Sequence, residues 1–224
     1  MSEREGLVRG EDGRLRCWWG AGPAGYRDYH DLEWGRPVVD DRLLFEMISL
    51  EGFQAGLSWW TILRKREAFR RAFDAFDPSR VARFGTRQVD RLLADAGIVR
   101  HRGKIEAVVA NAGRALDLAR ESGSLAAYFW RFEPAPSARP RTLTREALLD
   151  MVETEASRSL SRDLRRRGWK YVGPTTTQSF LQAVGLVNDH LEGCHVRGAA
   201  ERARQRLRRP RGHVPPSRFP SAAT

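Results

Sequence analysis

The sequence contains few cysteines and no long hydrophobic run. Only Cys17 and Cys194 occur among its 224 residues, so a scaffold held by a network of disulfides is excluded. No stretch approaches the roughly 20 apolar residues of a membrane-spanning helix, and none follows the opening MSEREGLVRGEDGR, so neither insertion nor export is indicated. We therefore expect a cytoplasmic protein, a location in which thiols stay reduced and bind metal more often than they form disulfides.

Alternating strand patterns strong enough to build a sheet are also missing, as are internal repeats, which argues against a sheet or a repeat array. Apolar residues instead recur at helical spacing from Asp41 onward. Glycine and proline turn signals separate the predicted helical segments, which include residues 104–121, 125–132, 145–167 and 175–187, with a proline-rich loop at 133–141. The pattern predicts an all-α protein.

Positive charge is concentrated near the C-terminus. The formal net charge is +11, and the segment from His195 onward carries eight arginines against the single Glu201. We expect three parts: a flexible leader at 1–16, a helical domain at 17–197 and a basic, unstructured tail at 198–224. The tail is either a solvated end or an arm that contacts DNA. No heptad or exposed apolar pattern argues against a monomer.

Both cysteines stand near histidines at opposite ends of the helical region. Cys17 precedes His30 by thirteen positions, and His190 precedes Cys194 by four. Two thiolates and two imidazoles form a tetrahedral set that suits zinc, and a closed set of four is structural rather than catalytic. Spacing alone leaves open that two buried cysteines and two surface histidines occur in this order by chance, or that His195 takes the place of His190 in the metal site.

Longer motifs surround these four residues. In chain order they are RCWWG, YRDYHDLEWGRP, LFEMISLEGFQAGLSWWTILRKRE, DAGIVRHRGKI and YVGPTTTQSFLQAVGLVNDHLEGC. Together they make residues 17 to 194 resemble the DNA-3-methyladenine glycosylase I family of bacterial base-excision repair. The leader and the tail lie outside this resemblance.

The resemblance implies a helix-hairpin-helix fold and hydrolysis of the N-glycosidic bond of 3-methyladenine in alkylated double-stranded DNA. It also implies one structural Zn²⁺ that joins the N- and C-terminal segments through Cys17, His30, His190 and Cys194. Asp189 lies roughly where other helix-hairpin-helix glycosylases carry a catalytic aspartate, but it directly precedes His190 and can simply orient that ligand. No lysine stands at an obvious nucleophile position, so we expect a monofunctional glycosylase without lyase activity. Because its substrate is DNA, we expect it to be associated with the nucleoid.

A damaged base must leave the helical stack before it is cut, and the pocket that receives it needs aromatic rings and a polar edge. The resemblance gives Glu51 of LEGFQAGLSW this base-recognition role, and Glu51 is also our candidate catalytic residue. Tyr29 and Trp59 are candidate stacking partners. Trp19 and Tyr26 are further candidates, although aromatic residues at helical spacing are more often part of a core.

Two segments are candidates for DNA-backbone contact. The turn before residue 175 places a glycine and a helix-starting proline ahead of threonines that could cap the helix, and its amides would bind phosphate through Gly173, Thr175 and Thr176. The basic run RHRGK offers Arg100, Arg102 and Lys104, with a solvated charged turn as the alternative. Leu57 after Gly56 could fill the gap left by the flipped base, or could belong to the core.

Two other functions stay open at this point. One is a glycosylase with shifted alkylpurine specificity. The other is a catalytically weak protein that binds DNA damage, against which Glu51 and the aromatic residues argue, because a pure binder need not keep them.

Overall fold

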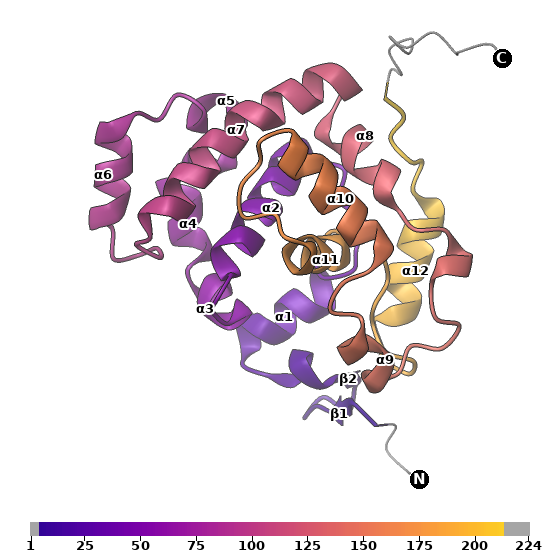
Figure 1. The fold of residues 1–224 in the computed structure, drawn as a ribbon. Coiled ribbons are helices and arrows are strands. Elements are labelled where there is room, and N and C mark those ends of the chain that lie inside the picture. Colours follow the sequence, from indigo (N-terminus) through magenta and orange to yellow (C-terminus); the bar gives the residue numbers. More distant parts are fainter. Residues whose placement is uncertain (1–4, 213–224) are drawn as a thin grey trace, which may run out of the picture.

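A computed structural model describes residues 5–212, and α-helices predominate in it (Figure 1). The helices are α1 (Ala24–Leu32), α2 (Asp41–Gln54), α3 (Trp59–Arg64), α4 (Arg66–Ala72), α5 (Pro78–Val81), α6 (Thr86–Ala94), α7 (Arg102–Ser122), α8 (Leu125–Phe129), α9 (Arg145–Asp150), α10 (Glu155–Arg166), α11 (Pro174–Ala183) and α12 (Arg197–Arg206). Short 3-10 turns are η1 (Trp18–Ala21), η2 (Asp74–Phe76), η3 (Trp130–Phe132) and η4 (Pro136–Ala138). The helical prediction is confirmed.

Helix α2 lies in the middle of the molecule, between α7, α8 and α11 (Figure 1). Asp40 caps its first turn by accepting from the amide of Leu43 at 2.9 Å. The carboxylate of Asp41 accepts from the first amides of α8, those of Leu125 and Ala126, each at 2.9 Å. Because these bonds satisfy amides at two helix starts, they fix α2 against α8.

Buried charges fasten α1 and α4 to α2. Arg66 donates to Glu46 at 2.5 Å and to Glu33 at 2.6 Å, and Glu46 also accepts from Arg70 at 3.0 Å. Glu46 is buried, so its charge needs these two guanidinium partners. The network holds the end of α1 beside the helix that carries Glu51.

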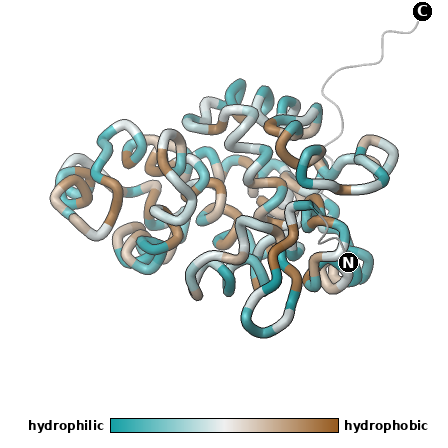
Figure 2. The backbone as a smooth tube through the Cα atoms, turned by 90° about the horizontal axis from the view of Figure 1, so that it is seen from below, coloured by the Kyte–Doolittle hydropathy of each residue, from teal (hydrophilic) through white to brown (hydrophobic). Residues whose placement is uncertain are grey.

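Hydropathy along the chain fits this packing. Figure 2 shows hydrophobic and hydrophilic stretches alternating along the helices, as amphipathic helices require. Within residues 5–212, none of the helices has the length and apolar character needed to cross a bilayer.

The segment 145–167, predicted as one helix, is two helices. Helix α9 ends at Asp150, and α10 begins after Thr154, whose hydroxyl accepts from the amide of Ser157 at 3.3 Å. The Ser157 hydroxyl in turn accepts from the Thr154 amide at 2.9 Å, which completes a capping box. The new start at Thr154 interrupts the helical pattern, and the periodicity alone did not reveal it.

The leader is not flexible over its whole length. Strands β1 (Leu7–Arg9) and β2 (Leu15–Cys17) pair antiparallel, with Leu7 opposite Cys17. Leu7 is buried in a small apolar cluster with both cysteines, Leu143, Leu191 and Val196. The prediction of an unstructured leader is therefore wrong from Leu7 onward, because this short strand buries a leucine against the C-terminal segment.

The tail also begins with structure. In α12, Ala200 is fully buried, and Leu207 just after the helix packs against the main core. Arg204 and Arg209 both pair with Glu133 at 2.7 Å. The prediction that residues beyond 197 are unstructured is wrong through residue 212. The rest of the predicted tail lies outside the described residues.

We expect Ala200→Asp to lower the free energy of unfolding by about 2–4 kcal/mol, because it places an unpaired carboxylate in a closed site. Gln205→Asp, on the exposed side of the same helix, is the matched control and should change it by less than about 0.5 kcal/mol. Urea denaturation of both variants measures the difference. Equal effects would mean that α12 does not pack on the body in solution.

Candidate functional site

Four buried ligand atoms meet where the two ends of the described chain come together. Cys17 ends β2, His30 lies in the last turn of α1, and His190 and Cys194 follow α11. Their side-chain ligand atoms all lie within 4.8 Å of one another. The Cys194 sulfur is 3.6 Å from His30 Nε2 and 3.7 Å from His190 Nδ1. This cluster could hold a metal ion, and it brings together the four residues that the spacing singled out.

Neighbouring groups fix the orientation of the two imidazoles. His30 Nδ1 is 2.8 Å from Asp31 Oδ1, and His190 Nε2 is 3.0 Å from the carbonyl oxygen of Trp34. Burial alone would raise the pKa of Asp31, but hydrogen bonds from Arg16 and His30 lower it to about 2, so this carboxylate stays ionised. His195 contacts Asp31 at 3.1 Å and lies outside the four. The remaining imidazole nitrogens are thus free to face the cluster.

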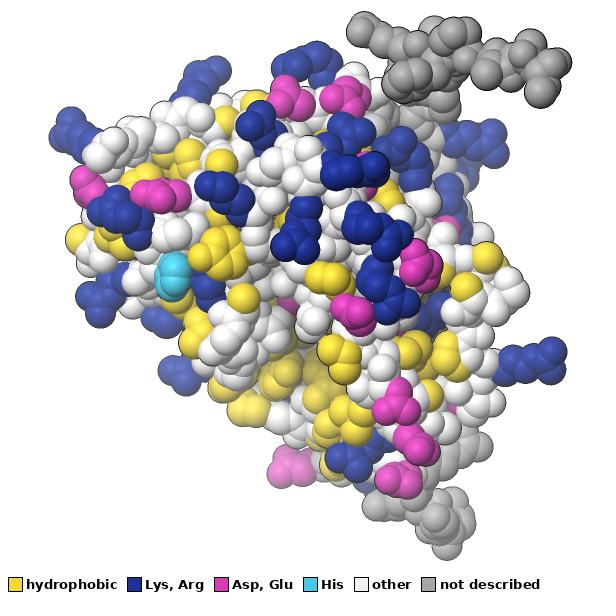
Figure 3. Space-filling model, in the orientation of Figure 1, with side chains coloured by type: hydrophobic (Ala, Val, Ile, Leu, Met, Phe, Trp, Pro, Cys, Tyr) yellow, Lys and Arg dark blue, Asp and Glu magenta, His cyan; other side chains and the backbone are white. Residues whose placement is uncertain are grey.

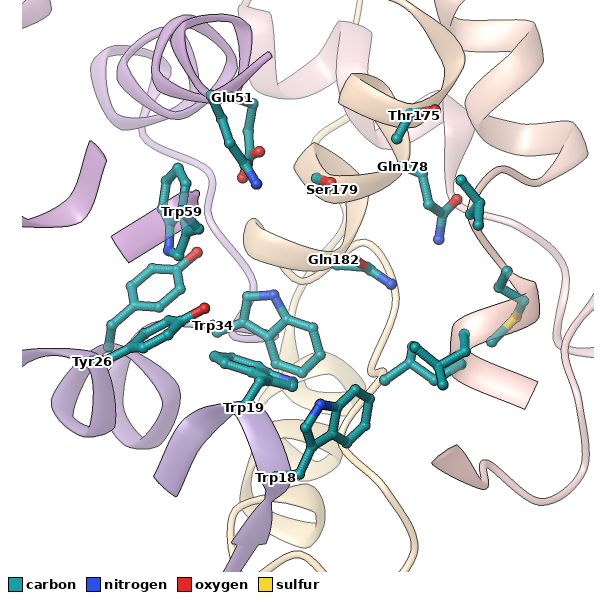
Figure 4. A pocket seen from close by; sticks show the side chains of 16 residues that line it. Trp18, Trp19, Tyr26, Trp34, Glu51, Trp59, Thr175, Gln178, Ser179 and Gln182 are labelled. Atoms are coloured by element: carbon teal, nitrogen blue, oxygen red, sulfur yellow. The ribbon is translucent and has the colours of Figure 1, made fainter. Parts of the chain in front are cut away.

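A cavity of about 290 Å³ lies beside the cluster. One wall is aromatic and comes from η1, α1 and α3, whereas the facing walls come from α9 and α11 (Figure 4). The lining residues are Trp18, Trp19, Tyr26, Tyr29, Trp34, Glu51, Gln54, Trp59, Leu148, Leu149, Met151, Val152, Thr175, Gln178, Ser179 and Gln182. Its size lies near the lower end of the range for small-ligand pockets, which begins at about 300 Å³.

Glu51 projects from α2 into this cavity (Figure 4). Its side chain is buried, and Oε2 has no hydrogen-bond partner among residues 5–212. Burial raises the pKa of Glu51 to about 8, because no cation nearby offsets the lost hydration. An unpaired buried acceptor is costly, and a ligand that brings a donor or a positive charge would relieve the cost.

The aromatic wall connects the pocket to the cysteine and histidine cluster. The rings of Tyr29 and Trp59 lie 5.4 Å apart between centroids, and those of Trp19 and Tyr26 lie 5.6 Å apart. Trp19 also packs edge-on against the His30 imidazole, at 4.9 Å. All four aromatic residues proposed from the sequence line the cavity, and His30 of the cluster directly contacts one of them, Trp19.

Several lining residues were missed by the sequence analysis. Trp18 and Trp34 lie within the quoted motifs RCWWG and YRDYHDLEWGRP, but neither was singled out as a pocket residue. On α11, the polar side chains of Thr175, Gln178, Ser179 and Gln182 line the cavity at helical spacing. This polar stripe within one helix was a visible signal, because positions three, four and seven apart share a face.

The turn before α11 is partly as expected. Gly173 is the N-cap and Pro174 the first helical residue, while Thr175 is exposed at the cavity. The threonines do not cap this helix. The Thr177 hydroxyl donates instead to carbonyl oxygens, such as that of Ser157 at 2.8 Å, so the first amides of α11 have no side-chain cap. They remain able to bind an anion.

The basic run divides into exposed and buried residues. Arg100 is exposed, and Arg102 pairs with Asp90 at 2.9 Å and Glu106 at 3.4 Å. Lys104 is buried and donates to the carbonyl oxygens of Phe53 and Ala55 at 2.9 and 2.5 Å. The expectation of a DNA contact at Lys104 is therefore corrected, because its ammonium satisfies carbonyls at the end of α2.

Neither Leu57 nor Asp189 lines this cavity. Leu57 is 40 % exposed and follows Gly56, whose φ of +78° favours glycine, so Leu57 stands out from the surface rather than in the core. Asp189 is fully buried and does not line the cavity. It accepts hydrogen bonds from Arg139 and from Gln182.

Comparison with known proteins gives a consistent result. A family model described as methyladenine glycosylase matches residues 18–197. The chain is 46% identical over 180 residues to DNA-3-methyladenine glycosylase 1 of Escherichia coli (strain K12), covering 80% of this chain and 95% of the relative. It is 41% identical over 182 residues to DNA-3-methyladenine glycosylase of Haemophilus influenzae, covering 80% and 96%.

Solved structures agree with this comparison. A crystal structure of 3-methyladenine DNA glycosylase I has a TM-score of 0.74 and 45% identity, over 80% of this chain and 98% of that one. A variant of 3-methyladenine DNA glycosylase I in complex with 3-methyladenine has a TM-score of 0.76 and 35% identity, over 81% and 97%. The family match ends at residue 197, so nearly all of α12 lies beyond it.

We expect Glu51→Gln to stabilise the protein increasingly as pH rises. The pKa of Glu51 is about 8 in the folded protein and 4.5 in the unfolded chain, so the folded state holds the proton more tightly. The free energy of unfolding of the wild type therefore falls as the pH rises from 4.5 to about 8. The amide variant lacks this loss, so its advantage over wild type should grow from little near pH 5 to at most about 5 kcal/mol above pH 8.

Unfolding experiments across this pH range, with the exposed Glu67→Gln as control, measure the trend. The same difference between Glu51→Gln and wild type at pH 5 and pH 9 would contradict a buried carboxyl that ionises only at high pH.

Proposed function

This chain belongs to the methyladenine glycosylase family, and we propose that it hydrolyses the N-glycosidic bond of 3-methyladenine in alkylated DNA. The observation that carries the proposal is Glu51, a buried and unpaired carboxylate that faces an aromatic wall. A relative with the same fold is described in complex with 3-methyladenine, which supports this lesion as the substrate. The chain is thus a DNA-repair glycosylase.

The pocket suits a flipped cationic base. N3-methylation leaves adenine with a formal positive charge, which the electron-rich faces of Tyr29 and Trp59 attract. The positive charge also favours ionisation of Glu51, which then accepts a hydrogen bond from the amino edge of the base. Burial and the neighbouring Glu51 raise the pKa of Tyr29, so its hydroxyl keeps the proton and can donate. Trp19 and Tyr26 extend the aromatic wall.

The leaving group makes the reaction less demanding. A cationic purine departs as a neutral base, so no general acid is needed. The pocket then has to stabilise the positive charge that develops on the sugar while water attacks. Ionised Glu51 is the one carboxylate among the lining residues, and we assign it electrostatic support of this step as well as base recognition.

We assign Zn²⁺ to the cluster of Cys17, His30, His190 and Cys194. Two sulfur and two imidazole donors, all buried and with their imidazoles oriented by Asp31 and a backbone carbonyl, fit a tetrahedral zinc ion. With four protein ligands no position is left for water, so the ion would be structural. It would hold β2 and α1 against the segment after α11.

Duplex DNA would lie across the face that contains α10 and α11, which we propose form the hairpin of a helix-hairpin-helix unit. Figure 3 shows Lys and Arg side chains gathered over α10, beside a hollow with hydrophobic walls. The exposed ones include Arg162 and Arg166. The uncapped backbone amides of Gly173, Thr175 and Thr176 would bind a phosphate. Arg100, Arg102 and Leu57 are further candidate contacts. We propose a monomer that works at the nucleoid in the cytoplasm.

We expect the purified protein to release free 3-methyladenine from methylated duplex DNA. Glu51→Ala should lower kcat/KM by about 10- to 100-fold, because it removes a hydrogen bond to a charged group that is worth about 1.5–3 kcal/mol. Chromatography of the released base measures the rate, and the exposed Glu67→Ala is the control. A Glu51→Ala enzyme as active as wild type would refute the assigned role.

We expect about one equivalent of zinc per chain. Cys17→Ser should lose the metal and several kcal/mol of stability, since binding to a structural site adds to folding free energy. His195→Gln, next to the cluster but outside it, should keep the metal. Metal analysis and thermal unfolding test both variants. Full metal content and an unchanged melting temperature in Cys17→Ser would rule out this ligand set.

A further inference from the structure

Helix α11 presents a polar stripe to the pocket, opposite the aromatic wall (Figure 4). Thr175, Gln178, Ser179 and Gln182 make up this stripe and all line the cavity. The two walls differ in chemistry: stacking rings and Glu51 on one side, amides and hydroxyls on the other. A nucleotide has the same division, because its base is flat and aromatic whereas its sugar and phosphates carry oxygen acceptors.

Gln178 is the residue of the stripe with an unused buried donor. Its side chain is only 2 % exposed, and Nε2 is buried without a partner among the described residues. Its Oε1 accepts from the Thr154 hydroxyl at 2.7 Å. That hydroxyl also accepts from the amide of Ser157, so its proton is free for Gln178. The bond fixes the amide with Oε1 occupied and Nε2 toward the cavity, as Figure 4 shows.

Gln182, one turn further along the same face, differs in this respect. Its Nε2 donates to Asp189 Oδ2 at 2.9 Å, so its amide is already engaged. A buried donor with no partner costs stability, and such a group is retained where a ligand completes the bond. Among the side chains of the stripe, Gln178 therefore has the buried amide donor that is left for a bound molecule.

We propose that Gln178 Nε2 donates to a phosphodiester oxygen of the flipped nucleotide. The inference rests on the proposed function, which places the base against Glu51, Tyr29 and Trp59. The glycosidic end of the nucleotide then points away from Glu51, toward α11. That end carries oxygen acceptors, and the neighbouring Thr175 is already a candidate for contact with the DNA backbone. Glu51 accepts and Gln178 donates, which matches a ligand with an amino group at one end and phosphates at the other.

Duplex DNA containing a tetrahydrofuran abasic analogue tests the contact, because it keeps the backbone and lacks the base. Gln178→Met preserves the size of the side chain and removes the donor, and should weaken binding about tenfold, the usual effect of losing one hydrogen bond to a charged group. Gln178→Glu should weaken it further, because a carboxylate would face the phosphate. Gln205→Met, the same change on the exposed face of α12, is the matched control and should bind as wild type does.

The free base provides the second arm. Binding of 3-methyladenine, followed by quenching of tryptophan fluorescence, should be the same in Gln178→Met and wild type. An equal loss in free-base affinity would overturn the proposal, since it would assign the contact to the base. Wild-type affinity of Gln178→Met for the tetrahydrofuran duplex would overturn it too. Melting temperatures show whether each variant is folded, and Gln178→Asn, which shortens the reach of the amide, repeats the test if the Met variant unfolds.

The experiment separates this inference from the proposed function. A wild-type protein that released no 3-methyladenine, yet bound the abasic duplex through Gln178, would refute the function and support the backbone contact. An active enzyme whose Gln178→Met variant bound the abasic duplex normally would support the function and refute the contact.

Discussion

The meeting of Cys17, His30, His190 and Cys194 is the constraint on which the rest of the site depends. These residues come from opposite ends of the described chain, and their ligand atoms lie within 4.8 Å of one another. Through His30, the cluster supports the ring of Trp19, and α1 also carries Tyr26 and Tyr29. The junction adds to the contacts of β1 and β2, which are only three residues each, and to the pairing of Glu33 with Arg66 at the end of α1. The cluster therefore supports the aromatic wall at Trp19, while Tyr29 and Trp59 pack in the main core.

The pocket contains a buried carboxyl oxygen, Glu51 Oε2, that has no hydrogen-bond partner among residues 5–212. Elsewhere buried charges are paired, as Glu46 is with Arg66 and Arg70. Glu51 has no such partner, and its raised pKa follows from burial alone. Helix α2 tolerates this cost because ten of its fourteen residues are buried and its ends are anchored, by Asp40 and Asp41 at the start and by Lys104 at the end. The packing of α2 thus offsets the cost of burying Glu51 without a partner, and a bound cationic base would reduce that cost.

Segments outside the family match also contribute to the body of the protein. Helix α12 covers part of the core through Ala200, and Arg209 lies over the ring of Trp130 at 5.5 Å. A high density of arginine predicted an unstructured tail, yet Arg204 and Arg209 share Glu133 as a partner. Composition alone could not show this, because Glu133 lies some seventy residues earlier in the chain, in a predicted loop.

The sequence alone predicted the helical class, the meeting of the four cysteine and histidine residues, and a pocket lined by Glu51, Tyr29 and Trp59, because these depend on local periodicity and on motifs of fixed spacing. Tertiary structure decided the rest. It placed Lys104 inside against two carbonyls and paired β1 with β2. It also left Gln178 with Oε1 bonded and Nε2 without a partner among residues 5–212. Each of these outcomes depends on a partner distant in sequence, and hydrogen bonding and burial between such partners are set only when the helices pack.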